Sequence, residues 1–392
     1  MTFTPLAADF YGMAADLTEA EQASLAEIRT FMEQQVAPVI DEHWHRDAFP
    51  MGLIPGVAAL GVIGPGWQET ARFENSAVYR GWVALEMSRI DASISTFVGV
   101  QNGLVAGSIG VGGDDAQRAE WLPKLADCSV VGAFGLTEPL SGSDSARGLR
   151  TTARRDGDEW VIDGAKRWIG NATHADIVII WAKDVADGQV KGFIVPTDTP
   201  GFRATKIERK IALRMVQNAD IELEGVRVPE SLRLQRAESF RDTSRVLRLT
   251  RAEVAWSAVG IMVGAYEAAV RYTTEREQFG KPLAGHQLVQ DLLAKSLGHI
   301  TASIALCVQV SRMLDEGRQE DAHSALAKAF TTTRMREVVA WCREVCGGNG
   351  IVTDYGVARF FADAEALYTY EGTAQMNSLI VGRAITGESA FV

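Results

Sequence analysis

The sequence predicts an α+β protein in three parts: a helical N-terminal domain over residues 1–128, an antiparallel β domain over 129–238, and a helical, four-helix-bundle-like C-terminal domain over 239–392. Three observations lead to this prediction. Apolar residues recur with helical spacing in the first part, short β-branched and aromatic runs replace them in the second, and long amphipathic runs fill the third. At 392 residues the chain is long enough for two or three domains with a buried core.

The first part carries three helix signals. Thr18–Val36 is periodic in its apolar residues and opens with a capping box completed by Glu21. Further helices are expected over Ser76–Met87 and over Asp114–Leu125, the latter with an acidic first turn and an end near Pro123. These signals predict that the N-terminal part is helical.

The middle part is predicted to form strands because its short apolar segments are rich in β-branched and aromatic residues. Asp156-Gly157 and Asp187-Gly188 are strong hairpin signals. We therefore expect an antiparallel unit rather than a βαβ series. The expected strands are Val130–Leu136, Leu149–Ala153, Glu159–Ile162, Ile177–Ala182, Lys191–Val195 and Val216–Leu223.

The last part contains long amphipathic runs at 243–276, 286–317 and 321–346, without a recurring strand pattern. Gly347-Gly348 follows the third run, and glycine is common just beyond a helix C-terminus. Long helices joined by short connections predict a helical bundle.

Composition excludes several classes of function. Lys and Arg number 39 against 50 Asp and Glu, which gives a net charge of −11 and disfavours a nucleic acid or an anionic membrane surface as partner. The first residues lack the basic and apolar regions of a signal peptide, and we expect no membrane insertion. Four scattered cysteines favour a reduced, cytoplasmic protein. Cys342 and Cys346 are interpreted as buried small side chains rather than as metal or redox ligands.

Common catalytic motifs are missing from the sequence. Gly107–Asp115 is glycine-rich but does not match the dinucleotide-binding pattern, and Pro139–Asp144 is not a serine-hydrolase elbow. His43 and His45 have no third ligand at metal-binding spacing, so we expect no metal site.

Three separated segments together make a specific signal. They are Phe134–Asp144 (FGLTEPLSGSD), Arg276–Leu283 (REQFGKPL) followed by His286 and Gln287, and Gly347–Gly350 (GGNG) with Tyr368–Gln375 (YTYEGTAQ) downstream. In this order and spacing they resemble the acyl-CoA dehydrogenase and acyl-CoA oxidase flavoprotein family. Within it the sequence is most similar to glutaryl-CoA dehydrogenases and plant short-chain acyl-CoA oxidases, on the segments Ile90–Ser93, Lys166–Asn171, Gly192–Val195 and Leu213–Asn218.

The chemistry of that family needs a base and an electron sink. Desaturating a thioester removes an α proton and a β hydride, and no side chain accepts a hydride, so the resemblance implies bound FAD. Glu371 stands at the family's base position, and a water-poor pocket would raise its pKa toward the working pH. A solvated glutamate is the alternative. Tyr370, Gly372, Thr373 and Gln375 in register favour the base.

The resemblance also implies how FAD is held. Phe134, Leu136 and Thr137 would meet the pyrimidine edge, and Trp168 would pack against the flavin ring unless it is a core residue of the β domain. A second set would hold the diphosphate and adenine of the FAD in a neighbouring subunit, which requires at least a dimer and implies a homotetramer. That set is Arg276, Gln278 and Phe279, assisted by Gln287. Gly347 and Gly348 would let backbone approach the dinucleotide closely, and Thr373 and Gln375 would supply further phosphate or adenine contacts.

Substrate contacts follow from the same resemblance. Ser143 matches a position near the pantetheine arm, Tyr370 and Gly372 flank the base, and the Glu371 backbone N–H with a flavin ribityl hydroxyl would hold the thioester oxygen. Arg251 matches an arginine under the active-site floor, where it is equally well interpreted as a structural ion-pair partner.

The acyl pocket departs from glutaryl-CoA dehydrogenases. They carry an arginine and a glutamate where this chain has Ser95 and Ser88, so a distal carboxylate would be buried unpaired. A short, uncharged acyl group is favoured, although the nearby Arg89 keeps glutaryl-CoA open.

Gly170 is the second departure. Many dehydrogenases have a threonine there that reaches flavin N5, whereas plant oxidases share the glycine. The predicted function is FAD-dependent dehydrogenation of a short-chain acyl-CoA with an electron-transfer flavoprotein as acceptor. The alternatives are an oxidase that reduces O₂ to H₂O₂, a glutaryl-CoA dehydrogenase, and a silent flavin- or acyl-CoA-binding subunit. A carrier-protein thioester in place of CoA also stays open.

Overall fold

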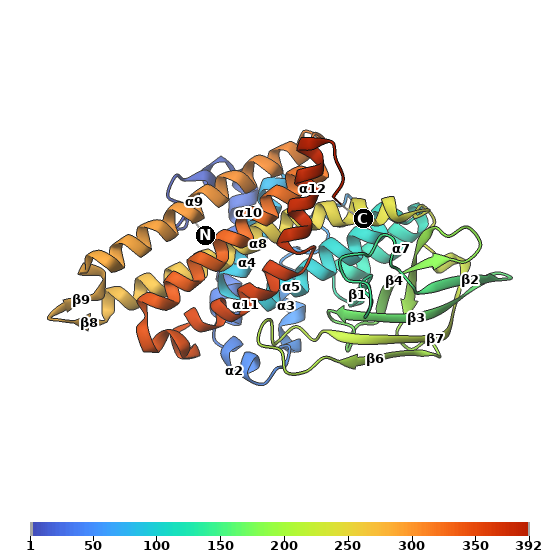
Figure 1. The fold of residues 1–392 in the computed structure, drawn as a ribbon, viewed down its shortest axis with the longest axis horizontal. Helices are drawn as coiled ribbons and strands as arrows, with labels where there is room; N and C mark the ends of the chain where they lie inside the picture. The colour runs from blue at the N-terminus through green and yellow to red at the C-terminus, as the bar shows by residue number, and fades with distance from the viewer. Residues whose placement is uncertain (1–2, 391–392) are drawn as a thin grey trace.

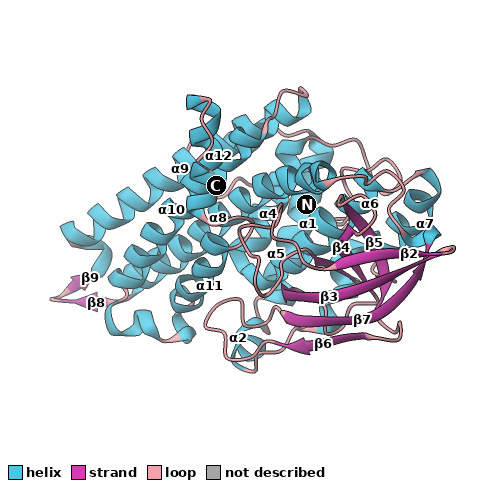
Figure 2. Cartoon of the chain, turned by 45° about the vertical axis from the view of Figure 1, so that its right-hand side comes forward, coloured by secondary structure: helices cyan, strands magenta, loops and turns pink. Residues whose placement is uncertain are grey.

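The computed structural model describes residues 3–390 and places a bundle of long helices beside a twisted sheet (Figures 1 and 2). The predicted order of helical, β and helical parts is confirmed. The helices of the first part are α1 (Glu19–Phe31), α2 (Ile40–His45), α3 (Ile54–Ala59), α4 (Ala77–Ile90), α5 (Ala92–Gly99), α6 (Gly107–Gly112) and α7 (Asp115–Ala126).

Side-chain caps fix the starts of the predicted N-terminal helices. The Thr18 side chain and Glu21 form the expected capping box of α1, Ser76 caps α4, and Asp114 caps α7. Pro123 does not mark the end of α7 but lies inside it, and the helix continues to Ala126.

The sequence did not predict the helical stretch Ala92–Gly112, which runs through α5, the π-helix η4 (Val100–Ala106) and α6. A stretch packed on several sides carries no amphipathic period, so the usual helix signal is weak. By length and composition this stretch and α9 (Gln287–Asp315) could cross a membrane. The first is 67% buried inside the protein, which is typical of a core helix.

The middle part forms a seven-stranded mixed sheet in the order β1-β4-β2-β3-β7-β6, with β5 paired to β4. Both predicted hairpins, β2–β3 and β4–β5, are confirmed. The expectation of a purely antiparallel unit is wrong, because β4 pairs in parallel with β1 and with β2. The strands are β1 (Gly132–Gly135), β2 (Thr152–Asp156), β3 (Glu159–Ile169), β4 (Ile177–Asp184), β5 (Val190–Pro196), β6 (Phe202–Lys206) and β7 (Ala219–Pro229).

The C-terminal part consists of long antiparallel helices and a small hairpin (Figure 1). Its predicted helices appear as α8 (Phe240–Glu275), α9 and α10 (Asp321–Val345). The hairpin β8–β9 (Glu277–Gln278 and Lys281–Pro282) joins α8 to α9 at the end of the molecule away from the sheet (Figure 1). Two shorter helices follow, α11 (Val357–Thr369) and α12 (Ala374–Thr386).

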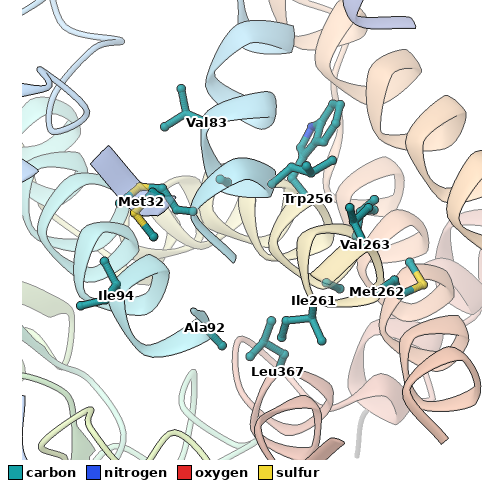
Figure 3. Packing of buried hydrophobic residues seen from close by; sticks show 14 of the residues in the cluster. Met32, Val83, Ala92, Ile94, Trp256, Ile261, Met262, Val263 and Leu367 are labelled. Carbon is teal, nitrogen blue, oxygen red and sulfur yellow. The ribbon is translucent and has the colours of Figure 1, made fainter. Parts of the chain in front are cut away.

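Helix α8 passes through the main core. Its Trp256 and Ile261 are buried among side chains of the N-terminal helices and of α11, such as Val83 and Leu367 (Figure 3). Gly260 lets α8 approach α4 closely, because a Cβ there would collide with the Leu85 carbonyl oxygen. This close packing of α8 against α4 fixes the position of the side chains that α8 presents to the site.

Candidate active site

Glu371 lies in the turn between α11 and α12, and its backbone is left-handed with φ +54°. Gly372 follows with φ +78°, so two consecutive residues share this conformation. Thr373 then caps α12 by accepting a hydrogen bond from the Met376 N–H at 3.2 Å. A non-glycine residue in this conformation is uncommon and costs backbone energy, so the surroundings must hold the turn in place.

The Glu371 carboxylate faces α8, where the Thr250 hydroxyl donates to its Oε2 at 2.9 Å. Burial raises the pKa of Glu371, against the opposing effects of the Arg251 charge, the Thr250 hydrogen bond and the Lys328 charge. The pKa therefore stands above the ordinary value for a glutamate, as the sequence analysis required of a base.

Lys328 of α10 binds the backbone of the turn that carries Glu371. Its fully buried Nζ donates to the carbonyl oxygens of Tyr368 at 3.1 Å and Gly372 at 2.7 Å, on either side of Glu371. The Asn377 amide donates to the Gly372 oxygen as well, at 2.8 Å. Burial lowers the pKa of Lys328 to about 7. The sequence analysis missed this residue, although a lone lysine in the apolar stretch at 325–330 was the available signal.

Arg251 has no ion-pair partner among residues 3–390, and its buried Nε has no hydrogen-bond partner there. The interpretation as a structural ion-pair partner is therefore wrong. Its charge lowers the pKa values of Glu371 and Lys328. The Tyr370 hydroxyl, on the other side of Glu371, lies 3.5 Å from the Thr96 hydroxyl.

The acyl side of the site is lined by serines where a charged pair was considered. The Ser88 hydroxyl donates to the Ser95 hydroxyl at 2.7 Å, and Ser95 lines a cavity of about 480 Å³ between α4, α5 and α8. Arg89 does not reach this cavity as a free cation. Its guanidinium pairs with Glu33, Glu86 and Glu267 at 2.5, 3.2 and 2.8 Å. A distal carboxylate on the substrate would find no spare cation at Arg89.

One set of predicted cofactor residues gathers at the sheet end that faces the helices. Trp168 sits at a bulge of β3 with φ +66° and is 51% exposed, so its interpretation as a core residue is wrong. The Arg167 N–H donates to the Thr137 carbonyl oxygen at 2.8 Å, which ties the end of β3 to the residues after β1. Phe134 lies in β1 and Leu136 directly after it, so both reach the same end.

Gly170 has space around it. A Cβ built there would approach Val216, Val100 and Asn218 no closer than 3.5 Å, which is ordinary contact. Neither steric crowding nor a positive φ therefore requires glycine at position 170. Ser143 lies exposed in the loop after β1.

The second set of predicted cofactor residues lies at the opposite end of α8, near the β8–β9 hairpin (Figure 1). Arg276, Gln278, Gly347 and Gly348 line a second cavity of about 480 Å³. Phe279 at the hairpin tip is 93% exposed. Gln287, the first residue of α9, is exposed nearby. Gln375 lies instead at the start of α12, where its amide is 3.4 Å from the Tyr368 hydroxyl.

One chain therefore does not bring the two sets together. The donor types nevertheless fit a flavin dinucleotide: a half-exposed indole for the ring at one end, and a guanidinium beside open glycines for a diphosphate at the other. Gly347 has φ +58° and open space where a Cβ would stand, so backbone can approach a ligand there.

Known proteins match the whole chain. The models of the N-terminal, middle and C-terminal domains of acyl-CoA dehydrogenases match residues 18–129, 133–226 and 240–386. The probable acyl-CoA dehydrogenase YngJ of Bacillus subtilis is 31% identical over 377 residues, which cover 95% of this chain and 99% of that protein.

Solved structures agree. Glutaryl-CoA dehydrogenase from Mycobacterium smegmatis superposes with a TM-score of 0.94 at 35% identity, covering 98% of this chain and 99% of that one, and a second structure of it contains FADH2. Butyryl-CoA dehydrogenase from Megasphaera elsdenii superposes with a TM-score of 0.90 at 30% identity, covering 94% of this chain and 99% of that one.

Proposed function

The chain belongs to the acyl-CoA dehydrogenase family, a family of FAD-dependent oxidoreductases, and we propose that it desaturates a short-chain acyl-CoA between its α and β carbons. Bound FAD supplies the acceptor for the β hydride. The single observation that carries the proposal is the Glu371 carboxylate, held by Thr250 with a raised pKa in a turn fixed by Lys328.

In this proposal Glu371 takes the α proton. A carboxylate with a raised pKa is a stronger base than an ordinary glutamate. The Thr250 hydroxyl of α8 orients the Glu371 carboxylate, because it donates a hydrogen bond to Oε2. A positioned base of this kind contributes about 10²- to 10⁴-fold to the rate.

The backbone of the same residue supports the thioester. Within residues 3–390 the Glu371 N–H makes no hydrogen bond, and the residue lies in a left-handed turn beyond the end of α11. A free donor next to the base suits the thioester oxygen, which gains negative charge as the α proton leaves. One residue would then remove the proton from one atom and stabilise the charge on another.

A short acyl chain without a terminal carboxylate is supported by the pocket wall. Ser88 and Ser95 satisfy each other by a hydrogen bond, and Arg89 is neutralised by three carboxylates. Burying an unpaired carboxylate costs several kcal/mol, so glutaryl-CoA is disfavoured as substrate. The intact site around Glu371 likewise disfavours a silent binding subunit.

We propose an electron-transfer flavoprotein as the electron acceptor. The second candidate, an oxidase that uses O₂, is favoured by one observation, the free space at Gly170 beside the expected flavin ring. The separation of the two cofactor-binding ends supports an oligomer, at least a dimer and by analogy a tetramer, in which each FAD spans two chains (Figure 1). We also retain the proposal of a cytoplasmic location, which the four unbridged cysteines support.

The test is anaerobic mixing of the purified yellow protein with straight-chain acyl-CoAs of increasing length. Bleaching of the flavin absorbance by a short acyl-CoA supports the proposal, and bleaching by glutaryl-CoA alone contradicts the substrate assignment. If no acyl thioester bleaches the flavin, the dehydrogenase proposal fails. Admitting air and assaying peroxide then separates an oxidase from a dehydrogenase.

A further inference from the structure

Glu253 is an ionisable side chain in the acyl cavity that the proposed reaction does not use. It lies on α8, one turn after Thr250, and lines the cavity of about 480 Å³ together with Ser95 and Trp256. Its carboxylate is close enough to that of Glu371 to raise the pKa of Glu253 by charge repulsion. The cavity therefore extends from the neighbourhood of the base, and the far part of an acyl group would occupy it.

The wall of the cavity is shaped around this carboxylate. A Cβ at Gly103 would lie 2.9 Å from the Glu253 Oε2, and one at Gly99 would lie 3.5 Å from Oε1. Larger residues at Gly103 would displace the carboxylate, so the wide π-helical segment η4 and its glycine leave it a recess. Asn102 donates to it as its hydrogen-bond partner, because the Asn102 oxygen is already used by the Gly64 N–H at 2.9 Å.

Among residues 3–390 no cation lies within ion-pair distance of the Glu253 carboxylate, although the charge of Arg80 acts on it from farther away and lowers its pKa. Burial raises the pKa of Glu253 to about 7, and one amide hydrogen bond does not replace the hydration of a carboxylate. A buried carboxylate becomes favourable when a cation with good geometry lies beside it. The cavity thus presents the Glu253 carboxylate without a cation in contact with it.

Arg80 is the cation that lines the same cavity, and its charge lowers the pKa of Glu253, but its nearest polar contacts are with other groups. Its guanidinium donates to the Asn75 side chain at 2.9 Å and lies 3.8 Å from the Asp315 carboxylate. The lining of the cavity holds two carboxylates, Glu253 and Asp315, against the one guanidinium of Arg80, so it is negative when both carboxylates are ionised. A negatively charged acyl group is therefore unfavourable there, and a positively charged one is favourable.

We propose that the substrate is a short acyl thioester that carries a cationic group, an ammonium or quaternary ammonium, at its far end, and that Glu253 is the residue that recognises it. This inference rests on the proposed dehydrogenation and adds the chemical class of the acyl group. It replaces the expectation of an uncharged acyl chain, since the sequence analysis considered Ser88 and Ser95 but not Glu253.

The test compares two acyl-CoAs of the same shape. 4-(Trimethylammonio)butanoyl-CoA and 5,5-dimethylhexanoyl-CoA differ by one positive charge. Their kcat/KM values are measured with the whole flavoprotein, and their Kd values are measured by flavin spectral titration in the Glu371→Gln variant, where turnover is blocked. The variants are Glu253→Gln and, as a matched control, Glu120→Gln, which removes an exposed carboxylate paired with Lys124 on α7, outside the cavity.

The proposal predicts that the wild-type site prefers the cationic compound by about tenfold or more, because the charge pair with Glu253 is lost with the neutral one. Glu253→Gln should abolish the preference, and Glu120→Gln should retain it. Equal or tighter binding of the neutral compound, or of glutaryl-CoA, by the wild-type protein overturns the inference even if Glu253→Gln does not fold. Turnover of the neutral compound alone would leave the dehydrogenase proposal standing and overturn this one. Binding of the cation without any bleaching would defeat the dehydrogenase proposal and, with it, the assignment of the cation as substrate, leaving only its recognition by Glu253.

Discussion

The buried ammonium of Lys328 donates a hydrogen bond to the carbonyl oxygen of Gly372 at 2.7 Å, one residue beyond Glu371. Lys328 donates a second hydrogen bond to the carbonyl oxygen of Tyr368, which precedes Glu371 in the chain. Since two successive residues of this turn are left-handed, the contact from α10 offsets backbone strain and aims the Glu371 carboxylate at the site.

Lys328→Met is expected to loosen the turn without leaving a void. Hydrogen bonds from a charged donor are worth about 1.5–3 kcal/mol, so both stability and rate should fall, the rate by about tenfold. The acidic limb of the kcat/KM profile should also move to higher pH, since the Lys328 charge no longer lowers the pKa of Glu371. Lys295→Met, at an exposed lysine paired with Asp291, is the control. A variant with normal rate and an unmoved pH profile would show that Lys328 has no positioning role.

Activity should fall as the pH drops, because the base must be ionised. The pKa of Glu371 is raised, so the loss should occur above the pH at which an ordinary glutamate is protonated. Thr250→Val removes a hydrogen bond that lowers the pKa of the carboxylate, so this limb should move to higher pH. The control Thr333→Val, whose hydroxyl binds the Ala329 carbonyl oxygen, should leave the profile in place. A Thr250→Val limb that moves down would contradict the account.

Gly170 is predicted to control access of oxygen to the reduced flavin. The space there accepts a side chain at ordinary contact distances, so Gly170→Thr should fold, bleach with substrate and reoxidise in air more slowly than the wild type. The measurement is the rate of flavin reoxidation after anaerobic reduction. Wild-type peroxide formation at the full turnover rate would favour the oxidase.

Shared cofactor sites predict complementation between two defective chains. Trp168→Ala and Arg276→Ala should each yield protein with little FAD, since each removes one end of the site. Random mixed dimers of the two should regain about a quarter of the sites, because one of the two sites in each mixed dimer is intact. Flavin absorbance per chain after co-expression measures this. Absence of any recovery, with mixed oligomers present, would argue against a site built from two chains.

Local signals in the sequence predicted much of the fold. The capping box of α1 and the Asp-Gly hairpins involve neighbouring residues, so their chemistry is visible without the structure. Strand β6 was missed because it is a partly exposed edge strand that carries Arg203 and Lys206 and lacks an apolar run. The stretch Ala92–Gly112 was missed because burial on several sides removes the helical period.

The candidate site was predicted where a motif is contiguous and missed where it depends on contacts across the chain. Glu371 and Trp168 stand in recognisable segments. Thr250 reaches Glu371 from 121 residues away, and Lys328 reaches Gly372 from 44 residues away. Glu253 gains its meaning only from the cavity that α4 and η4 form around it. Such contacts are products of packing and have no local signature.

Stopped-flow mixing of Glu371→Gln with a short acyl-CoA in the absence of oxygen tests the central claim most directly. Glutamine keeps the size of the side chain and its bond to Thr250 but cannot take a proton, so the variant should stay yellow, bind the acyl-CoA and bleach about 10²- to 10⁴-fold more slowly than the wild type. Bleaching at the wild-type rate would contradict the assignment of Glu371 as the base.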